Sequence, residues 1–363
     1  MHTMRRLTLA LGLALSLLLP MGGTAGAGPT LSVDPVKVGL NGPSAFTFAP
    51  DGRIWYLERG TGRIVVLDPS DGSEGRFFRI PGVDGSGERG ALGIALHPNW
   101  PTRRSVFVYV TRSSGGSLRN QVVRVTKSGG DTRMKILLST PASALPYHNG
   151  GRILIGPGNK LFVIIGDGHN RSNAQDRTHN LRGKILRLDL DGTAAPGNPF
   201  GRIWAYGIRN SFGMAFDPQT SRLWDLQNGP GCNDEINRIV RGGNFAWGPN
   251  ESCGSLPAPR DTNRDGPSPR RLPKHFFSTP IGISGGAFCQ SCGLRPSDEG
   301  KLFFGCVNDG EIRIARLDVD RRTITGVSSV LPTPNGAVHS MEVAPNGTIY
   351  FSDHAGIYRI VAS

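Results

Sequence analysis

The chain has 363 residues, and its 51 glycines and 27 prolines are too many for a protein built of long helices. Its net charge of +13 comes from basic residues scattered along the chain, without a long block of like charges, so we expect no nucleic-acid partner. The length is sufficient for one large hydrophobic core.

The first segment, residues 1–27, has the pattern of an export signal peptide. Arg5–Arg6 precede an apolar run, Leu7–Leu19, and the small residues Ala25–Ala27 follow it. We expect cleavage after Ala27, by either the Sec or the Tat route, and hence a secreted or periplasmic protein. The apolar run is too short for a permanent membrane span, and no later run reaches about 18 apolar residues, so we expect no stable membrane insertion.

One pattern recurs six times along the rest of the chain: an apolar stretch, a proline with turn residues, and an alternating strand. The six prolines are Pro50, Pro98, Pro157, Pro218, Pro296 and Pro345. Their spacing suits a four-stranded blade with its loops, and the alternation predicts antiparallel sheets packed face to face. We therefore predict an all-β protein, a six-bladed β-propeller in a single domain (28–363), with a pair of β-sandwiches as the alternative.

The ends and the longest insert of this domain carry further expectations. We expect Val36–Phe48 to pair with the C-terminal strand Gly356–Ile360, which would close the ring. The insert Trp247–Ser278 is rich in Pro, Asn, Asp and Arg and is predicted to be a surface loop.

The five cysteines of an exported protein are expected to form disulfides. Cys232 and Cys253 flank one motif-bearing loop and are the preferred pair. The other three cysteines, Cys289, Cys292 and Cys306, form one pair and leave one odd thiol, and the sequence does not decide which two are paired. Zinc is not expected, because no second pair of ligands accompanies the CxxC.

A histidine and an aspartate stand at the two ends of one predicted strand. His148 precedes the strand, Asp167 follows it, and in a blade we expect the intervening turn to bring both to the mouth of the central channel. A carboxylate that orients an imidazole creates a general base, although a structural histidine is the alternative interpretation.

Two further polar clusters follow in loops rich in glycine. Arg209 and Asn210 suit a planar ligand that is anionic or carries a carbonyl group, or they form a turn-stabilising ion pair. The segment Asn228–Asn237 offers Gly-Pro carbonyls to a hard cation such as calcium. Its acidic pair, Asp234 and Glu235, either adds charge there or holds the loop in place.

At these clusters the sequence resembles the PQQ-dependent glucose/sorbosone (aldose sugar) dehydrogenases. The resemblance covers residues 43–250 and returns near 340–361, and an upstream GExGxLGIAxHP-like match spans Gly87–Pro98. The ordered motifs are HNGG (148–151), GD (166–167), LxGKILRLDLDG (181–192), NPF (198–200), AYGIRN (205–210), GPxxxDEIN (229–237) and GGNFAWG (242–248).

The resemblance implies hydride transfer from a sugar to calcium-bound PQQ, with electrons passing to an acceptor that the sequence does not identify. His148 would take the sugar hydroxyl proton, and Asp167 would orient it. Arg209 would polarise the quinone carbonyl, with Asn210 beside it. Glu88 would lie with His148 at the substrate.

The resemblance also implies the metal ligands and one departure from the family. The carbonyls of Gly229 and Pro230 would hold the calcium ion. The family has a Lys and two Arg residues that contact the PQQ carboxylates, whereas this chain has Asn308 and His339 near those positions. With less charge pairing, PQQ would bind more weakly or not at all.

Two other function classes stay open. One is a cofactor-free propeller that binds carbohydrate or protein, and the other is a calcium-dependent, lactonase-like hydrolase with His148 or Asp167 as base. Gly282–Gly286 matches GxSxG but lacks the following helix of a hydrolase. Asp261–Gly266 opens like a calcium loop, but Leu272 replaces the glutamate such a loop needs.

Overall fold

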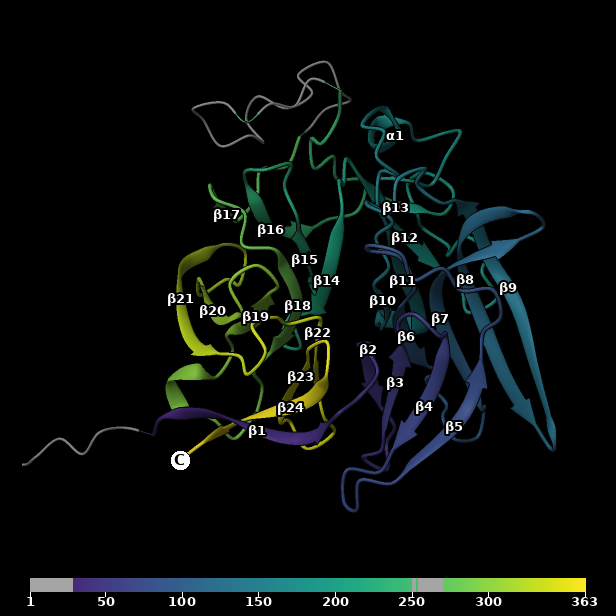
Figure 1. Ribbon diagram of the computed structural model, residues 1–363. Coiled ribbons are helices and arrows are strands. Elements are labelled where there is room, and N and C mark those ends of the chain that lie inside the picture. The colour runs from purple at the N-terminus through teal and green to yellow at the C-terminus, as the bar shows by residue number, and fades with distance from the viewer. Residues whose placement is uncertain (1–28, 250–252, 254–269) are drawn as a thin grey trace, which may run out of the picture.

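The computed structural model describes residues 29–249, 253 and 270–363, which form six four-stranded antiparallel sheets (Figure 1). The prediction of a six-bladed β-propeller is confirmed. The predicted signal peptide and the calcium-loop pattern at Asp261–Gly266 lie outside the described residues. Within the described ranges, helix is limited to α1 (Ser172–Gln175) and two short 3-10 turns, η1 (Pro157–Asn159) and η2 (Pro296–Asp298). None of these is long enough to cross a membrane.

Each blade consists of four strands that follow one another in the chain, with one exception in the last blade. The first three blades are β2 (Pro43–Phe48), β3 (Ile54–Glu58), β4 (Arg63–Leu67), β5 (Glu74–Arg79); β6 (Ala91–Leu96), β7 (Ser105–Ser114), β8 (Ser117–Ser128), β9 (Asp131–Pro141); and β10 (Ile153–Gly156), β11 (Lys160–Ile165), β12 (Lys184–Leu188), β13 (Ile203–Tyr206). The last three are β14 (Ser211–Phe216), β15 (Leu223–Gln227), β16 (Asp234–Ile239), β17 (His275–Phe277); β18 (Ile283–Phe288), β19 (Leu302–Cys306), β20 (Glu311–Leu317), β21 (Ile324–Pro332); and β22 (Ser340–Val343), β23 (Ile349–Ser352), β24 (Gly356–Ala362) with β1 (Leu31–Val38).

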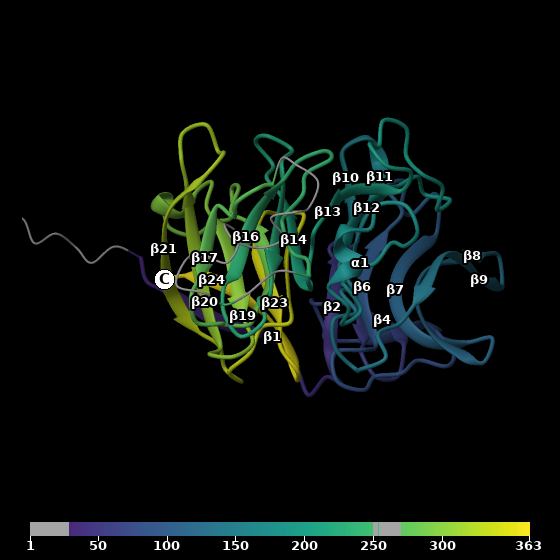
Figure 2. The same cartoon turned by 90° about the horizontal axis from the view of Figure 1, so that it is seen from above.

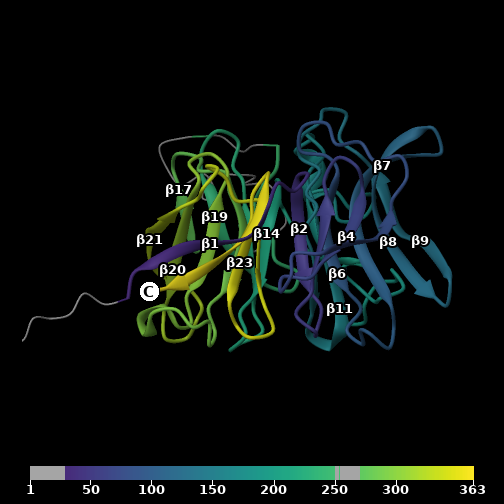
Figure 3. The ribbon, with the colours of Figure 1, turned by 60° about the horizontal axis from the view of Figure 1, so that its bottom comes forward.

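The first strands of the blades surround the axis, and each contacts the first strand of the next blade. Figure 3 shows β2 and β14 near the middle of the molecule and β9 and β21 at opposite outer edges. Viewed from above, the long hairpin β8–β9 projects on the side away from β21 (Figure 2). Each recurring proline lies between the first and second strands of its blade, as Pro50 does between β2 and β3. The loops that join blades, and the turns between second and third strands, therefore share the opposite end of the ring, which we call the loop end.

The ring is closed by strands from the two ends of the chain. β1 pairs antiparallel with β24, from Leu31 opposite Ala362 to Val38 opposite Gly356, and Figure 1 shows purple β1 beside yellow β24. The expected closure is confirmed for the residues up to Val38. It is wrong for Pro43–Phe48, because a turn at Gly39 and Gly42, both with positive φ, redirects the chain into the first blade.

Glycines allow the inner strands to approach one another closely at the axis. A Cβ atom on Gly93 would overlap the carbonyl oxygen of Gly151 in the next blade. A Cβ atom on Gly213 would overlap the carbonyl oxygen of Ser284 in the same way. The pairing register also shifts at both glycines, between Ala91 and Gly93 and between Ser211 and Gly213. At these irregularities the side chains of Leu92 and Phe212 turn toward the axis.

Two other expectations are settled by the fold. Cys232 pairs with Cys253 as preferred, Cys289 pairs with Cys292, and Cys306 is the odd, buried thiol. The insert Trp247–Ser278 is not entirely loop. Its residues His275–Phe277 form β17, the outer strand of the fourth blade, because they pair with Asp234–Ile236 of β16.

A buried carboxyl group in the fourth blade predicts how stability depends on pH. Asp225 is fully buried opposite Asn237, and burial raises its pKa to about 7, although Ser211 and Asn237 oppose the shift. The unfolded chain releases this proton near pH 4, so the stability from the protonated form is complete below pH 4. It is lost as pH rises to 7, at about 1.4 kcal/mol per pH unit.

Asp225→Asn is expected to remove this component of the pH dependence, because an amide does not titrate. Urea unfolding between pH 4 and 8 measures it, with the difference between variant and wild type as the readout. Asp320→Asn, which changes an exposed carboxylate, is the matched control and should follow the wild type. Parallel curves for Asp225→Asn and wild type would show that Asp225 is ionised in the folded protein.

Candidate functional site

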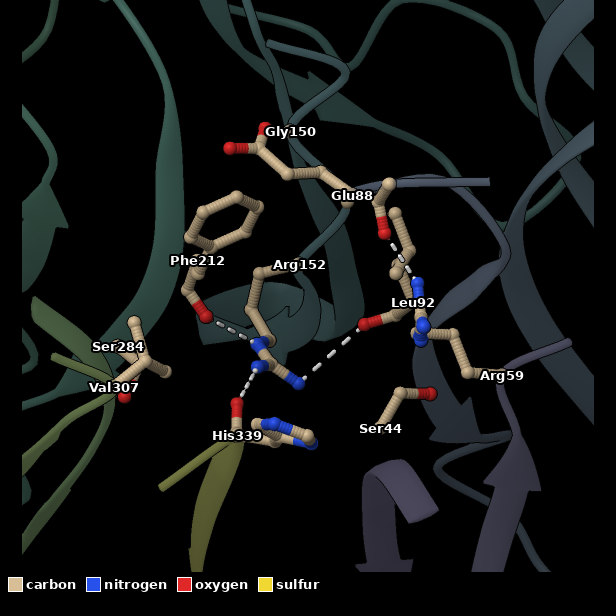
Figure 4. A pocket seen from close by; sticks show the side chains of 12 residues that line it. Ser44, Arg59, Glu88, Leu92, Gly150, Arg152, Phe212, Ser284, Val307 and His339 are labelled. Atoms are coloured by element: carbon tan, nitrogen blue, oxygen red, sulfur yellow. Dashed lines mark hydrogen bonds between the residues drawn. The ribbon is translucent and has the colours of Figure 1, made fainter. Parts of the chain in front are cut away.

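A cavity of about 320 Å³ lies on the axis at the loop end. Its lining comes from all six blades, which places it at the centre of the ring (Figure 4). The lining residues are Ser44, Arg59, Gly87, Glu88, Leu92, Gly150, Gly151, Arg152, Phe212, Ser284, Val307 and His339.

Arg152 crosses the axis and joins the third blade to three others. Its guanidinium donates hydrogen bonds to the carbonyl oxygens of Phe212 (2.8 Å) and His339 (2.8 Å) and to the Ser340 hydroxyl (3.2 Å). A longer contact of 3.5 Å reaches the Leu92 carbonyl, and Figure 4 shows the bonds from Arg152 to Phe212, His339 and Leu92. Burial lowers its pKa to about 10, so it remains a cation at neutral pH.

Arg59 brings a second positive charge to the cavity wall. One nitrogen, Nη1, donates to the carbonyl oxygens of Gly85 (3.1 Å), Gly87 (2.5 Å) and Arg89 (3.2 Å). These bonds anchor the guanidinium on the loop between the first and second blades. The cavity therefore has two fixed cations, neither of which has a carboxylate partner within hydrogen-bond distance among the described residues.

His148 precedes β10 and Asp167 follows β11, and the turn between these antiparallel strands brings both residues to the loop end, as expected. The Nδ1 atom of His148 lies 2.8 Å from Oδ1 of Asp167, and both side chains are buried. Because a carboxylate only accepts, Nδ1 carries the proton and Nε2 carries the lone pair. Nε2 makes no hydrogen bond with any described residue, so it is available to accept a proton.

The carboxylate of Asp167 gathers donors from three segments. Oδ1 also accepts the backbone N–H of His169 (2.8 Å), and Oδ2 accepts the indole N–H of Trp247 (2.7 Å). Each of these donors belongs to, or directly follows, a non-glycine residue with positive φ: His148 at 60°, His169 at 62° and Ala246 at 74°. Such conformations are costly and persist where surrounding contacts enforce them.

Glu88 links the His148 loop to the loop of Asn210. Its Oε2 atom accepts the backbone N–H of His148 (2.8 Å) and the Nδ2 donor of Asn210 (2.9 Å). The Oδ1 atom of Asn210 accepts the N–H of Gly150 (3.1 Å). Glu88 therefore connects the loops that precede the third and fourth blades, in addition to lining the cavity.

The three predicted clusters are joined by hydrogen bonds. The backbone N–H of Asp167 donates to the Arg209 carbonyl (2.7 Å), and Nη1 of Arg209 donates to the Asn228 carbonyl (2.9 Å). Gly229 and Pro230 follow Asn228 directly. The guanidinium of Arg209 also lies over the Trp247 ring, 5.4 Å from its centroid.

Asp234 holds the predicted calcium loop in place. Its Oδ1 atom accepts the N–H of Gly229 (2.8 Å), and its Oδ2 atom accepts the N–H groups of Ile281 (2.9 Å) and Gly282 (2.8 Å). Of the two roles left open for this carboxylate, the structure shows the structural one. At position 229 only glycine fits, because a Cβ atom would overlap the Cys232 carbonyl oxygen.

Asn308 and His339 come from the fifth and sixth blades, and of these two only His339 is among the residues that line the cavity. The amide of Asn308 donates to the Pro280 carbonyl (3.3 Å). Burial, together with the charge of Arg59, lowers the pKa of His339 to about 4. His339 is therefore neutral at pH 7 and brings no positive charge.

A buried lysine holds the loop that carries Asp167. The Nζ atom of Lys184 donates to the carbonyl oxygens of Asn173 (2.5 Å), Ala174 (3.2 Å) and Arg182 (2.6 Å), and burial lowers its pKa to about 7. The GxSxG serine, Ser284, lies in strand β18 and donates its hydroxyl to the carbonyls of Gly305 and Val338. Its hydroxyl is thus occupied by backbone, which does not fit a hydrolytic nucleophile.

Sequence reasoning missed the residues that the fold brings in from elsewhere. Arg59 and Arg152 looked like scattered surface arginines, and the only local signal was that Arg152 directly follows the HNGG motif. Trp247 belongs to the recognised GGNFAWG motif, but its partner, Asp167, lies 80 residues earlier. His169 stands two residues after Asp167 of the GD motif, and this position was its available signal.

Comparison with known proteins adds a family and several relatives. The model of the Glucose / Sorbosone dehydrogenase family matches residues 40–360. Quinoprotein glucose dehydrogenase B of Acinetobacter calcoaceticus is 35% identical over 243 residues, which is 57% of this chain and 50% of that protein. Aldose sugar dehydrogenase YliI of Escherichia coli K12 is 27% identical over 343 residues, 88% of this chain and 89% of that protein. The PQQ-bound aldose sugar dehydrogenase of Streptomyces coelicolor has a TM-score of 0.78 at 26% identity, covering 92% of this chain and 98% of that one.

Proposed function

Because the chain belongs to the glucose/sorbosone dehydrogenase family, we propose that it oxidises an aldose or related sugar with PQQ, bound together with calcium, as hydride acceptor. The observation that carries the proposal is the linked set His148, Asp167, Arg209 and Asn228 at the loop end. We also propose that the protein is exported, on the signal-like pattern of residues 1–27.

In this proposal His148 is the general base. Its Nε2 lone pair accepts the proton of the sugar hydroxyl as hydride leaves the carbon that carries this hydroxyl. Asp167 fixes the tautomer that makes Nε2 a base and stabilises the imidazolium that forms. Glu88 sets the position of the imidazole through the His148 backbone, and as a residue that lines the cavity it would contact the sugar.

The residues present fit PQQ through a different set of charges from the family's better-known members. When bound, PQQ would supply the hydride-accepting chemistry. Arg209 and Asn210 would hold it at the quinone side, with the carbonyls of Gly229 and Pro230 as calcium ligands. Asn308 and neutral His339 would offer hydrogen bonds only. Arg59, fixed on the cavity wall, would supply positive charge for the carboxylates.

A PQQ titration tests this proposal. Saturable, calcium-dependent binding followed by absorbance, and dye reduction with glucose, are expected for the wild type. Arg59→Gln keeps a polar side chain but removes the charge, and is expected to weaken PQQ binding about tenfold. Arg79→Gln, which changes an exposed arginine in β5, is the control and should bind PQQ like the wild type.

The other outcomes of the titration identify the remaining function classes. Sugar binding without saturable PQQ binding would contradict the proposal and indicate a cofactor-free propeller. Lactone hydrolysis without quinone would indicate the calcium-dependent hydrolase. Equal PQQ affinity in Arg59→Gln and wild type would remove Arg59 from the cofactor site and leave the sugar dehydrogenase proposal intact.

A further inference from the structure

A second histidine lies against the proposed base. The rings of His148 and His169 meet edge to face, with centroids 4.6 Å apart. His169 is exposed, whereas His148 is buried, and the His169 ring makes no hydrogen bond with any described residue. A polar ring without a partner therefore stands at the solvent side of the proposed base.

The backbone of His169 adopts a conformation that favours glycine. Its φ is 62°, and its neighbour Gly168, with φ of 68°, is also left-handed. The backbone N–H of His169 donates to Oδ1 of Asp167, the same atom that accepts Nδ1 of His148. Glycine at position 169 would provide this N–H without the steric cost of a side chain. The structural role alone thus gives no reason for a histidine at this position.

We propose that the imidazole of His169 is a specificity-determining contact of the sugar site, an inference that rests on the proposed function. When the reacting hydroxyl of a sugar lies at Nε2 of His148, the hydroxyl on the next carbon of the sugar lies beside the His169 imidazole. Imidazole can donate to such a hydroxyl or accept from it. His169 therefore favours aldoses with a hydroxyl on the carbon next to the reacting one, and discriminates against their deoxy analogues.

The test compares glucose with 2-deoxyglucose in the wild type and in His169→Gly. The ratio of kcat/KM for the two sugars is expected to fall about tenfold in the variant, because one hydrogen bond to the substrate is lost. His169→Gln, which keeps a polar side chain that donates and accepts, should restore part of the ratio. The Tm of His169→Gly should stay within about 2 °C of the wild type or rise, because glycine suits the left-handed backbone.

Ser221→Gly is the matched control for the backbone change. Ser221 has a φ of 55°, is exposed, and lies in the turn between β14 and β15, at the end of the ring opposite the cavity. This variant should show a similar change in Tm and an unchanged ratio for the two sugars. An unchanged ratio in His169→Gly, or a large loss of its stability, would overturn the inference.

An NMR titration separates this inference from the proposed function. Addition of glucose to the PQQ-loaded and PQQ-free proteins is expected to shift the ring resonances of His169. If the wild type oxidises no sugar but these resonances shift, the oxidation proposal fails and the contact stands. If sugar is oxidised, but glucose does not shift the His169 resonances and His169→Gly does not change the kcat/KM ratio, the contact is wrong and the oxidation proposal stands.

Discussion

Replacement of His148 by asparagine is expected to lower kcat for sugar oxidation about 10³-fold, because no group then accepts the hydroxyl proton. Asparagine tolerates the φ of 60° at this position, so the surrounding loop should keep its conformation. Dye reduction after reconstitution with PQQ and calcium measures the loss. The PQQ titration of the same variant should give close to the wild-type affinity, since His148 is not among the proposed cofactor contacts.

His179→Gln provides the control for this experiment. The His179 side chain is 87% exposed on the same loop as Asp167, and its change should leave kcat unaltered. If His148→Asn keeps more than about a tenth of the wild-type kcat, another group takes the proton, because loss of a true general base costs at least about 10²-fold.

Asp167→Asn is expected to lower both activity and stability. The Asp167 carboxylate accepts hydrogen bonds from three donors, two at Oδ1 and one at Oδ2. An asparagine at this position has only one oxygen, so it cannot accept on both sides. With Oδ1 toward His148 and the His169 N–H, the amide Nδ2 faces the Trp247 indole N–H, donor against donor. We expect a loss of about 2 kcal/mol in the free energy of unfolding. Loss of the negative charge beside the imidazolium should lower kcat about 10²-fold.

A second substitution tests the cause of this instability. Trp247→Phe removes the opposing donor, so Asp167→Asn/Trp247→Phe should be more stable than the sum of the two single changes predicts. Urea unfolding of the four proteins measures this coupling. The activity of the double variant should remain low, because the carboxylate charge is still absent. Additive stability effects would show that the conflict between the two donors is not the cause.

The sequence alone determined the architecture and the identity of the three polar clusters. The six prolines with their flanking alternation recur because each blade is a local unit whose turn and strands are encoded within one stretch of chain. The Cys232–Cys253 pair was accessible for a similar reason, since both cysteines flank one loop. His148 and Asp167 flank the hairpin of β10 and β11, so their proximity followed from the blade itself.

Only the tertiary structure decided which residues from separate blades share the cavity. Arg152 reaches His339, 187 residues later, and Trp247 reaches Asp167 across 80 residues. A buried arginine bonded to carbonyl groups has the same local sequence pattern as an exposed one, because its partners lie on other blades. The chemistry of single loops is therefore encoded locally, whereas the charge and the shape of the central site arise from closure of the ring.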